Sequence, residues 1–271
     1  MIDKLQTEVQ NVKTLNLDKA SSLEAIDMFY NEDKLVAEAV NRERESLSII
    51  IDKISEAYEA GGRIIYVGAG NSGRLAMCDA TECPPTFNVS PERVVAVVAG
   101  GITSLHSALE SVEDSEEAAI SDLEKLKLKD NDIIIGLSAS GRTPYVKSAL
   151  REYKDLLTIA ISCNKNSEIS EVAKYAVEID VGPEVITGST RLKAGTAQKM
   201  ILNMISSIVM TKQGYVKQNM MINVKITNKK LMQRAINILK YFYDVTEVEA
   251  KNLLESNELE MRKVIKILEG E

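Results

Sequence analysis

Hydrophobic residues recur along the middle of this chain in two alternating patterns. Between residues 63 and about 210, short β-branched runs such as VVAVVA and DIIIGL alternate with segments whose apolar residues recur every three or four positions. The runs predict strands and the other segments predict helices. We expect strands at 63–67, 94–99, 132–137, 157–162 and 176–181, and helices at 72–82, 104–126, 144–152, 168–174 and 191–213. This alternation is typical of a parallel sheet with helices on both faces, so the sequence predicts an α/β fold.

The segments before and after this region have a helical pattern. A capping box at Ser21 and Glu24 predicts the start of a short helix, and a longer helix is expected at 33–60. Residues 1–20 show no periodicity and are expected to lie extended. Three amphipathic segments follow at 228–242, 246–255 and 257–269. We therefore divide the chain into an N-terminal segment with helices (1–62), a sheet domain (63–225) and a small C-terminal helical module (226–271).

The composition narrows the classes of partner. The 271 residues are 45% hydrophobic and carry a formal net charge of −7, which argues against a nucleic acid or an anionic membrane as partner. No apolar run approaches the length of a membrane span, and the first residues lack a secretory pattern, so we expect a cytoplasmic protein. Three cysteines without C-x-x-C spacing indicate neither a disulfide framework nor a metal site. Cys83 has no evident base partner, and we expect a reduced thiol.

A glycine- and serine-rich turn occurs twice, each time after an expected strand. The segments Gly68–Arg74 (GAGNSGR) and Gly136–Arg142 (GLSASGR) share Gly, Ser, Gly and Arg at the same spacing. A strand–turn–helix aims backbone N–H groups and the positive end of a helix dipole at one point, which suits a phosphate. Thr143 and Pro144 match an N-cap and a first helical residue after the second turn, whereas Pro84 is expected to end the helix after the first. Both turns are expected beyond the carboxyl ends of the strands.

Two other phosphate sites fit parts of this pattern. Gly68, Gly70 and Gly73 match the G-x-G-x-x-G fingerprint of dinucleotide sites, but the next expected strand ends in two glycines and not in the acidic residue of that fingerprint. The second turn resembles a Walker loop in which Arg142 replaces the lysine, and arginine is not an equivalent ligand there. Clustered hydroxyl groups favour an anion site over purely structural turns. They belong to Ser72, Ser138 and Ser140.

Two carboxylates are candidates for acid–base chemistry. Glu82 stands near the expected end of the helix after the first turn, where the negative end of the helix dipole favours a protonated carboxyl group, as a general acid requires. Glu113 belongs to an acidic cluster with Glu110 and Asp114. For both candidates, a solvated position on a helix surface is the alternative interpretation. His106, the only histidine, is more typical of a packed or surface residue.

The longest blocks of the sequence resemble one family. They are VGAGNSGR (67–74), ATECPPTF (80–87), SASGRTPYV (138–146), IAISCN (159–164) and VGPEVITGSTRLKAGTAQK (181–199). In content, order and spacing they are similar to the N-acetylmuramic acid 6-phosphate etherases, and with TEVQN and LNLD near the N-terminus the resemblance covers roughly residues 5–235. It implies a sugar isomerase (SIS) fold, a flavodoxin-like three-layer parallel sheet, in a homodimer that uses no metal, nucleotide or other cofactor. The C-terminal segment is similar to the family's small, UBA-like helical module.

The resemblance also implies an activity. The family hydrolyses the D-lactyl ether of N-acetylmuramic acid 6-phosphate to N-acetylglucosamine 6-phosphate and D-lactate in peptidoglycan recycling, by elimination followed by hydration. Its two carboxylates fall on Glu82, which we assign as the acid at the ether oxygen, and Glu113, which we assign as the base at C2. The implied residues for the substrate and its phosphate are Ser72, Gly73, Ser138, Ser140, Gly141, Thr143, Ser189, Thr190 and Lys193.

Two further classes of protein stay open. An aldose–ketose isomerase on the same fold would share the phosphate turns and a glutamate base, although the TECPP and GSTRLKAGTAQK blocks point away from it. A non-catalytic sugar-phosphate sensor, of which the related glucokinase regulatory protein is an example, would keep the serines. It would not need an acid at Glu82.

The position of Glu82 adds a geometric constraint. Ser72 and Glu82 are ten residues apart, so a continuous helix separates them by about 15 Å along its axis. A hexose phosphate bound at the helix N-terminus cannot span that distance to the same chain's Glu82. Either the helix breaks before Glu82, or Glu82 serves the site of the other subunit in a two-fold dimer. We favour a homodimer with shared sites, whose small-molecule partner is a sugar phosphate.

Overall fold

The sheet predicted from the apolar runs is present. The computed structural model describes residues 5–107, 109 and 111–270. Its five parallel strands have the order β2-β1-β3-β4-β5. They are β1 (Ile64–Gly68), β2 (Val94–Val98), β3 (Ile133–Ser138), β4 (Leu157–Ser162) and β5 (Tyr175–Glu178). This is the flavodoxin-like order, and its topological switch point lies between β1 and β3.

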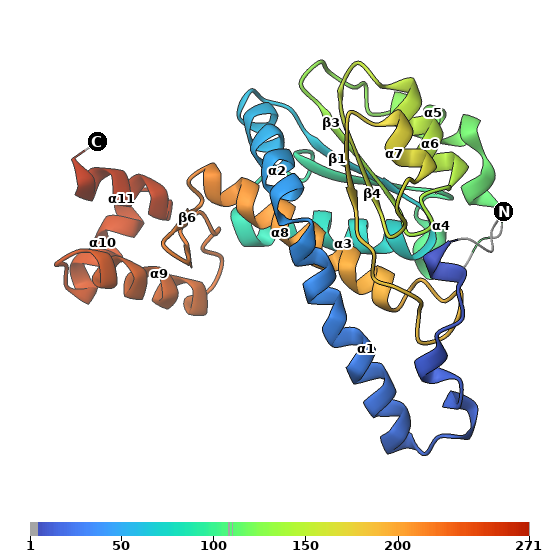
Figure 1. Cartoon of the computed structure of the whole chain (residues 1–271). Helices are drawn as coiled ribbons and strands as arrows, with labels where there is room; N and C mark the ends of the chain where they lie inside the picture. Colours follow the sequence, from blue (N-terminus) through green and yellow to red (C-terminus); the bar gives the residue numbers. More distant parts are fainter. Residues whose placement is uncertain (1–4, 108, 110, 271) are drawn as a thin grey trace.

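Helices cover both faces of the sheet, which gives the predicted three layers (Figure 1). One face packs against α1 (Ser22–Arg42), α2 (Arg44–Glu59), α3 (Gly70–Phe87) and α8 (Lys193–Lys212). The other face packs against α5 (Glu116–Glu124), α6 (Pro144–Glu152) and α7 (Glu168–Val172). Alternate strand residues enter the two cores, for example Ile64 and Tyr66 on one side and Ile65 and Val67 on the other. Both sets are fully buried, which explains why these strands are apolar without interruption.

The N-terminal region differs from the prediction in two ways. Residues expected to be extended form three short turns of 3₁₀ helix: η2 (Gln6–Glu8), η3 (Val12–Thr14) and η4 (Leu17–Lys19). The capping box at Ser21 is confirmed, but the helix that it starts continues to Arg42, beyond the expected boundary near residue 33. The break comes at Glu43, whose carboxylate accepts a hydrogen bond from Lys165 Nζ at 2.7 Å. No glycine or proline interrupts the segment before it, so the helix runs on.

The prediction that Pro84 ends α3 is wrong. The helix continues through Pro84 and Pro85 to Phe87, and Asn88 closes it in a left-handed conformation, with φ of 49° and its N–H on the Pro84 carbonyl. Two main-chain hydrogen bonds are missing because proline has no N–H. Cys83 and Phe87 are buried one turn apart and hold the last turn in the core.

The helix expected at 104–126 is interrupted. It is divided into α4 (Thr103–His106), η5 (Val112–Asp114) and α5. Ser107 is extended and Ser111 is left-handed, with φ of 63°. Ser115 then caps α5 by accepting a hydrogen bond from the Ala118 N–H at 3.2 Å.

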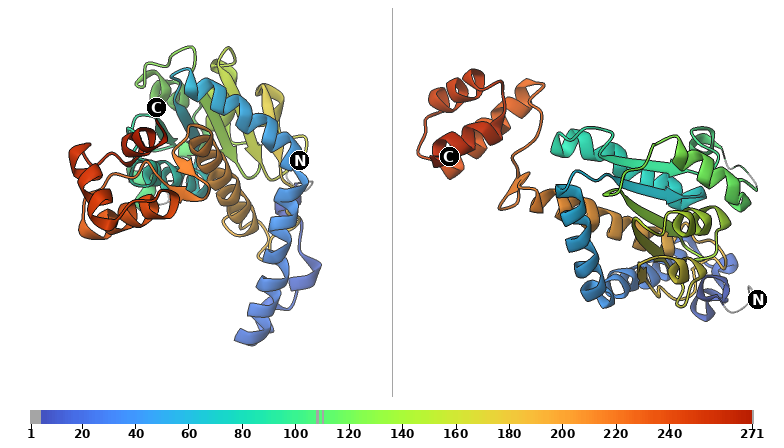
Figure 2. Two further views of the ribbon diagram at one scale, coloured as in Figure 1. Left: turned by 90° about the vertical axis from the view of Figure 1, so that its left-hand side faces the viewer. Right: turned by 90° about the horizontal axis from the view of Figure 1, so that it is seen from above.

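The C-terminal segment folds around an apolar cluster of its own. It consists of a short hairpin of β6 (Val216–Lys217) and β7 (Met220–Met221), followed by α9 (Lys229–Phe242), α10 (Glu247–Ser256) and α11 (Met261–Glu269). The three predicted helices are confirmed, and together they stand apart from the sheet beyond the end of α8 (Figure 2). Their apolar cluster includes Ile222 and Val224, which precede the expected domain boundary. The division of the chain at residues 62/63 and 225/226 stays a prediction.

Candidate active site at the carboxyl edge of the sheet

Both glycine- and serine-rich turns lie at the carboxyl edge of the sheet, on its two central neighbours. The first follows β1 and the second follows β3, and these strands pair in parallel with Gly68 opposite Leu137. Because the switch point of this strand order falls between them, a ligand cleft is expected here. The topology therefore brings together two turns that are almost 70 residues apart in the sequence.

In the first turn the helix begins almost at once. Gly70, with φ of +51°, is the first residue of α3, and Ser72 is buried in its first turn. A Cβ atom at Gly73 would lie 2.5 Å from Val98 Cγ1 and 2.9 Å from the Gly68 carbonyl oxygen. Gly73 thus permits close packing of the helix on the strands, and the N–H groups of the first helical turn keep no acceptor within the helix.

In the second turn the hydroxyl groups bond to one another. Ser138 Oγ lies 2.8 Å from Thr143 Oγ1 and 3.3 Å from Ser140 Oγ, and it accepts the Gly141 N–H at 3.0 Å. Gly141 has φ of +73°, and a Cβ atom there would lie 2.3 Å from Ser167 Cβ. Thr143 and Pro144 begin α6 as predicted, although Thr143 Oγ1 faces Ser138 and does not cap the helix. The turn holds three hydroxyls in one connected cluster.

One residue of this edge was missed by sequence reasoning. Gln198, on α8, is completely buried, and its Oε1 accepts a hydrogen bond from Ser72 Oγ at 2.9 Å. It lies within the GTAQK block, but no local pattern marks it. Its partner is 126 residues away in the chain. A buried amide on an otherwise apolar helix face is the one available signal.

The two candidate carboxylates are exposed and stand on different elements. Glu82 lies on α3 more than one turn before its end, so the negative end of the helix dipole, which acts within the last turn, does not reach it. Glu113 lies in η5, after β2. Arg74 Nε donates to the Ser104 carbonyl at 3.0 Å and ties the start of α3 to the segment that leads to Glu113. Glu110 lies outside the described residues.

A cavity of about 580 Å³ borders the segment around Glu113. It is lined by Gly100, Gly101, Ser111, Val112, Ser115, Ala118 and Asp122. Gly100 and Gly101, both with positive φ, follow β2 at the same edge of the sheet as the two turns. The structure thus places open volume beside the predicted base and on the ligand side of the sheet.

The remaining predicted residues belong to the loop before α8 and to its start. Ser189 and Thr190 are half-buried in that loop, whereas Lys193 is buried and its Nζ lies 2.7 Å from Glu32 Oε2. Thr190 directly precedes the helix expected at 191–213 and was predicted to cap it, but it does not cap α8. Glu184 does so with its carboxylate, which accepts the N–H groups of Lys193 and Ala194.

The buried carboxylate of Glu32 forms ion pairs with two lysines, Lys13 and Lys193. Besides Lys193, its side chain accepts hydrogen bonds from Lys13 Nζ at 3.1 Å and Asn11 Nδ2 at 3.0 Å. Burial by itself would raise the pKa of Glu32, but these three donors hold the pKa below its ordinary value. In this structure the Lys193 ammonium group is therefore engaged by a carboxylate on α1.

The N-terminal segment crosses the same edge. Thr7 is buried, its hydroxyl accepts a hydrogen bond from Asn164 Nδ2 at 3.2 Å, and its carbonyl accepts the Gly188 N–H. Asn164 Nδ2 also donates to the Ala139 carbonyl in the second turn at 3.0 Å. This N-terminal strap (residues 5–9) thereby connects the second turn to the loop before α8. No periodic pattern in the sequence predicts it.

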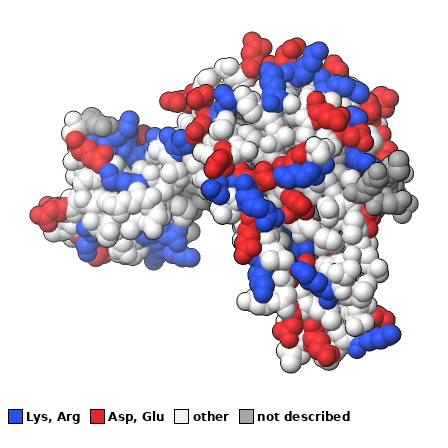
Figure 3. Space-filling model, viewed as in Figure 1, with Lys and Arg blue, Asp and Glu red and all other residues white. Residues whose placement is uncertain are grey.

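Other potentially reactive groups are not part of the site at the carboxyl edge of the sheet. Burial raises the pKa of the Cys83 thiol to about 12, which makes it a poor nucleophile. No three of the described His, Cys, Asp and Glu residues are grouped so that they could hold a metal ion. Acidic and basic side chains are interspersed over the face in Figure 3.

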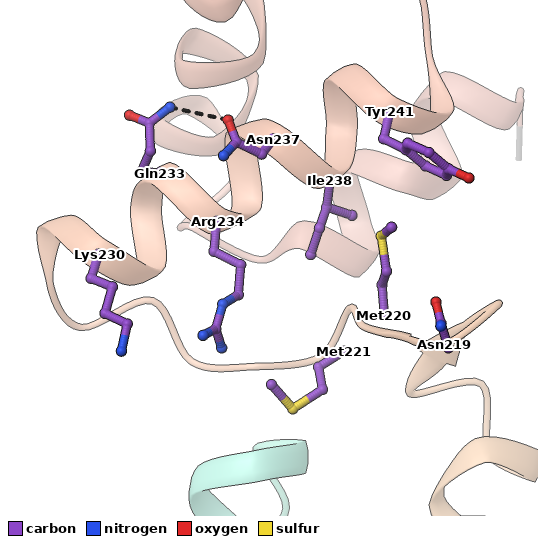
Figure 4. Close-up of a pocket in the computed structure, with 9 residues that line it drawn as sticks. All are labelled: Asn219, Met220, Met221, Lys230, Gln233, Arg234, Asn237, Ile238 and Tyr241. Carbon is purple, nitrogen blue, oxygen red and sulfur yellow. Dashed lines mark hydrogen bonds between the residues drawn. The ribbon is translucent and has the colours of Figure 1, made fainter.

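The C-terminal module has a separate cavity of about 770 Å³ beside α9 (Figure 4). It is lined by Asn219, Met220, Met221, Lys230, Gln233, Arg234, Asn237, Ile238 and Tyr241. None of the predicted site residues lines it. We therefore place the candidate active site at the carboxyl edge of the sheet.

Comparison with solved structures supports the fold. Phosphoheptose isomerase GmhA from Neisseria gonorrhoeae is similar with a TM-score of 0.54 at 16% identity, over 70% of this chain and 100% of that one. The Vibrio vulnificus NanR protein complexed with ManNAc-6P has a TM-score of 0.51 at 13% identity, over 85% of this chain and 74% of that one. At such identities the likeness concerns the fold alone.

Sequence comparison is more specific. Residues 46–164 match the glucokinase regulatory protein N-terminal SIS domain, and residues 218–264 match the C-terminal lid domain of the same protein. N-acetylmuramic acid 6-phosphate etherase of Lactobacillus gasseri is 49% identical over 94% of this chain and 86% of its own length. The Bacillus subtilis etherase is 45% identical over 98% of this chain and 88% of its own length. Identity of this extent, on a sheet with the expected topology, means that the chain belongs to the N-acetylmuramic acid 6-phosphate etherase family.

Proposed function

We propose that this protein hydrolyses the D-lactyl ether of N-acetylmuramic acid 6-phosphate and releases N-acetylglucosamine 6-phosphate and D-lactate. It is then a carbon–oxygen lyase of peptidoglycan recycling and amino sugar catabolism. The observation that carries the proposal is 45–49% identity to etherases over nearly the whole chain. The two turns at the β1/β3 edge support it, because the N–H groups at the start of α3 and the clustered hydroxyls of the second turn can donate to a sugar phosphate.

The proposed reaction has two stages. In the first, Glu113 takes the C2 proton of the open-chain sugar while Glu82 gives a proton to the ether oxygen, so that the C3–O bond breaks and lactate leaves. In the second, water adds its hydroxyl to C3 and a proton returns to C2. The open volume beside η5 supports a place for the sugar near Glu113. No metal or other cofactor is needed for either stage.

The phosphate is the proposed anchor of the substrate. Hydroxyl and backbone donors of the two turns would hold it, and the loop before α8 would line the sugar. These residues are Ser72, Gly73, Ser138, Ser140, Gly141, Thr143, Ser189, Thr190 and Lys193. The connected hydroxyls of the second turn support this role, because a doubly charged phosphate monoester accepts several hydrogen bonds at once.

We further propose that two chains share their active sites. The course of α3 supports this: it is unbroken from Gly70 to Phe87, so Glu82 is held about 15 Å along the axis from Ser72. An exposed apolar stripe on α1 supports a second copy as partner. Its residues Leu23, Ile26 and Tyr30 are each more than 60% exposed, on a part of α1 that projects from the body (Figure 1).

We place the enzyme in the cytoplasm, without a nucleic-acid or membrane partner. The net charge of −7 supports this proposal, because it disfavours polyanionic surfaces. Among the described residues, none of the helices combines the length and the apolarity that a membrane crossing requires.

The activity is tested by incubating the protein with N-acetylmuramic acid 6-phosphate in heavy-oxygen water. We expect D-lactate to form and the label to appear at C3 of the sugar. Label in lactate would mean attack at the lactyl carbon and would overturn the mechanism. Interconversion of aldose and ketose phosphates without lactate would identify an isomerase, and binding without any turnover would identify a sensor.

The shared site is tested by mixing two inactive variants, the Ser72→Ala/Ser138→Ala double variant and Glu82→Gln. If sites are shared, a heterodimer combines both defects in one site and leaves the other intact, so half of its sites regain activity. If each chain supplies its own Glu82, every site carries one defect. Mixtures that exchange subunits and stay inactive would exclude the shared arrangement.

A further inference from the structure

The first helical turn of α3 is buttressed by α8. Asn71 Nδ2 lies so close to Gly195 that a Cβ atom added there would be 2.7 Å from it. One turn further along α8, Gln198 meets Ser72 through the 2.9 Å hydrogen bond. Successive residues of the first phosphate turn therefore rest on α8 positions three residues apart, which share one helix face. The turn does not position its own hydroxyl.

The direction of this hydrogen bond has a chemical consequence. Ser72 Oγ donates its one proton to Gln198 Oε1, and a hydroxyl has no second proton to offer to a phosphate. At the same time Gln198 Nε2 is buried and has no hydrogen-bond partner among the described residues. The amide thus has two unused protons, while the hydroxyl beside it has none to spare.

A half-turn of the side-chain amide would reverse the direction of this hydrogen bond. It brings Nε2 to the position of Oε1, so that Nε2 donates to Ser72 Oγ and the serine proton becomes free to point at the phosphate. The two ends of an amide have nearly the same shape, so the exchange needs no extra room. Donors in series also polarise one another and strengthen the final hydrogen bond to the anion.

We infer that Gln198 is a positioning residue of the phosphate site, which donates through Nε2 to Ser72 Oγ so that the Ser72 hydroxyl donates to the 6-phosphate. This inference rests on the proposed function, since it assigns Ser72 to the phosphate. It adds α8 to an anion site that the turn sequences alone ascribe to two loops.

A double-mutant cycle separates this role from a structural one. The probe is N-acetylglucosamine 6-phosphate, whose binding is measured by calorimetry and does not require ether cleavage. The variants are Ser72→Ala, Gln198→Met, which keeps the length and removes both polar ends, and their combination. We expect each single change to raise Kd by about tenfold, as loss of a donor to a charged acceptor does. The combination should be no weaker than Ser72→Ala alone, because Gln198 acts through that hydroxyl.

Gln198→Glu provides a second readout if Gln198→Met fails to fold. As a carboxylate it can only accept, and when protonated it regains one O–H donor. The Kd ratio of Gln198→Glu to the native protein should therefore fall as the pH is lowered from 8 to 5.5; taking the ratio removes the titration of the phosphate itself, which occurs near pH 6. The matched control is Thr196→Glu, which adds the same charge at an exposed position on the same helix turn. It should change Kd by less than about twofold.

Additive effects of Ser72→Ala and Gln198→Met would overturn the inference, as would a fall in melting temperature without a change in Kd. A pH-independent ratio for Gln198→Glu would overturn it as well. If the protein binds N-acetylglucosamine 6-phosphate but releases no lactate, the proposed function fails, while the cycle still decides the role of Gln198.

Discussion

The two glycine- and serine-rich turns have the same residues at the same spacing and different structures. The sequence aligns Gly68 with Gly136, yet in the sheet Gly68 pairs with Leu137, one residue later. One residue separates β1 from α3 in the first turn, whereas five residues separate β3 from the start of α6 at Pro144 in the second. A repeated sequence has therefore not produced a repeated fold.

The difference lies in where each turn finds its support. The hydroxyl groups of the second turn find their partners within the turn, because they bond to Ser138 or to one another. The carbonyls of this turn are held from outside, since Ala139 and Gly141 accept the N–H groups of Cys163 and Ile169. The first turn has a single hydroxyl, and its partner is Gln198 on a helix that follows 126 residues later. Local sequence thus arranges the hydroxyls in one half of the predicted anion site, while in the other half the hydroxyl depends on the tertiary fold.

The largest effect should come from Glu82, the proposed acid on the helix of the first turn. Replacing Glu82 by Gln removes the proposed proton donor and should lower kcat by about 10²- to 10⁴-fold. The matched change on the helix of the second turn, Glu152→Gln, should leave kcat within about twofold. Steady-state release of D-lactate measures both. Equal kcat values for the native protein and Glu82→Gln would remove Glu82 from the chemistry.

Alanine at the turn glycines should break the second turn more severely than the first. Gly141→Ala combines a positive φ with overlap against Ser167, and each of these costs about 1–3 kcal/mol. Gly73→Ala has only the overlap with Val98 and the Gly68 carbonyl. The free energy of unfolding in urea should therefore fall more for Gly141→Ala. The opposite order would mean that the second turn can relax and is not fixed by its own contacts.

Alanine at the turn serines should weaken phosphate binding and lower stability at both turns. Ser72→Ala and Ser138→Ala each remove a donor to a charged acceptor, worth about 1.5–3 kcal/mol, so KM should rise about tenfold or more. Each change also removes a hydrogen bond inside the protein: Gln198 Oε1 loses the Ser72 donor, and the Gly141 N–H keeps only the Ser138 carbonyl, at 3.1 Å. The free energy of unfolding should therefore fall by about a further 1 kcal/mol in each variant. Kinetics and urea unfolding of both variants check this. An unchanged KM in both would exclude these serines from the phosphate site.

The smallest expected effect is a loss of stability at low pH, through protonation of Glu178. Glu178 accepts the N–H groups of Asn166 and Ser167, both at 2.8 Å, beside the residue that packs on Gly141. Burial alone would raise the pKa of Glu178, but these donors hold it below its ordinary value. A lowered folded-state pKa means that the stabilisation is complete above the unfolded pKa of about 4.3 and is lost as pH falls through the folded value. The native protein should therefore exceed Glu178→Gln in unfolding free energy by about 1 kcal/mol at pH 7, and the gap should narrow as the pH falls below the unfolded value and through the folded one. A gap that widens on acidification would contradict the assignment.

The sequence predicted the sheet well because its signal is local. Each of the first four strands is a nearly unbroken apolar run, followed by a glycine turn or by a helix with its own period. These four strands and α6 were therefore located within one residue, whereas β5 ends three residues before its expected end. The carboxyl-edge rule then placed both turns on the same side. The roles of Glu82, Glu113 and the loop residues stay predictions, because these roles depend on where the substrate lies relative to the side chains.

The features that were missed depend on distant partners. Pro84 lies inside α3 because Cys83 and Phe87 pack in the core, and tertiary packing outweighs the loss of two hydrogen bonds. Glu184 caps α8 from nine residues away, and Gln198 meets Ser72 across the domain. A polar side chain shows in the sequence that it needs a partner, and it does not show which one.

The N-terminal strap has a consequence for the order of events during synthesis. Thr7 leaves the ribosome well before its partner Asn164, which follows 157 residues later. At a translation rate of about 5–20 residues per second, roughly 8 to 30 s pass between the synthesis of Thr7 and that of Asn164. During that interval the second turn can fold, but the strap cannot yet bind to the edge of the sheet beside it. The carboxyl edge of the sheet is therefore completed late in synthesis, by a segment that was made well before it.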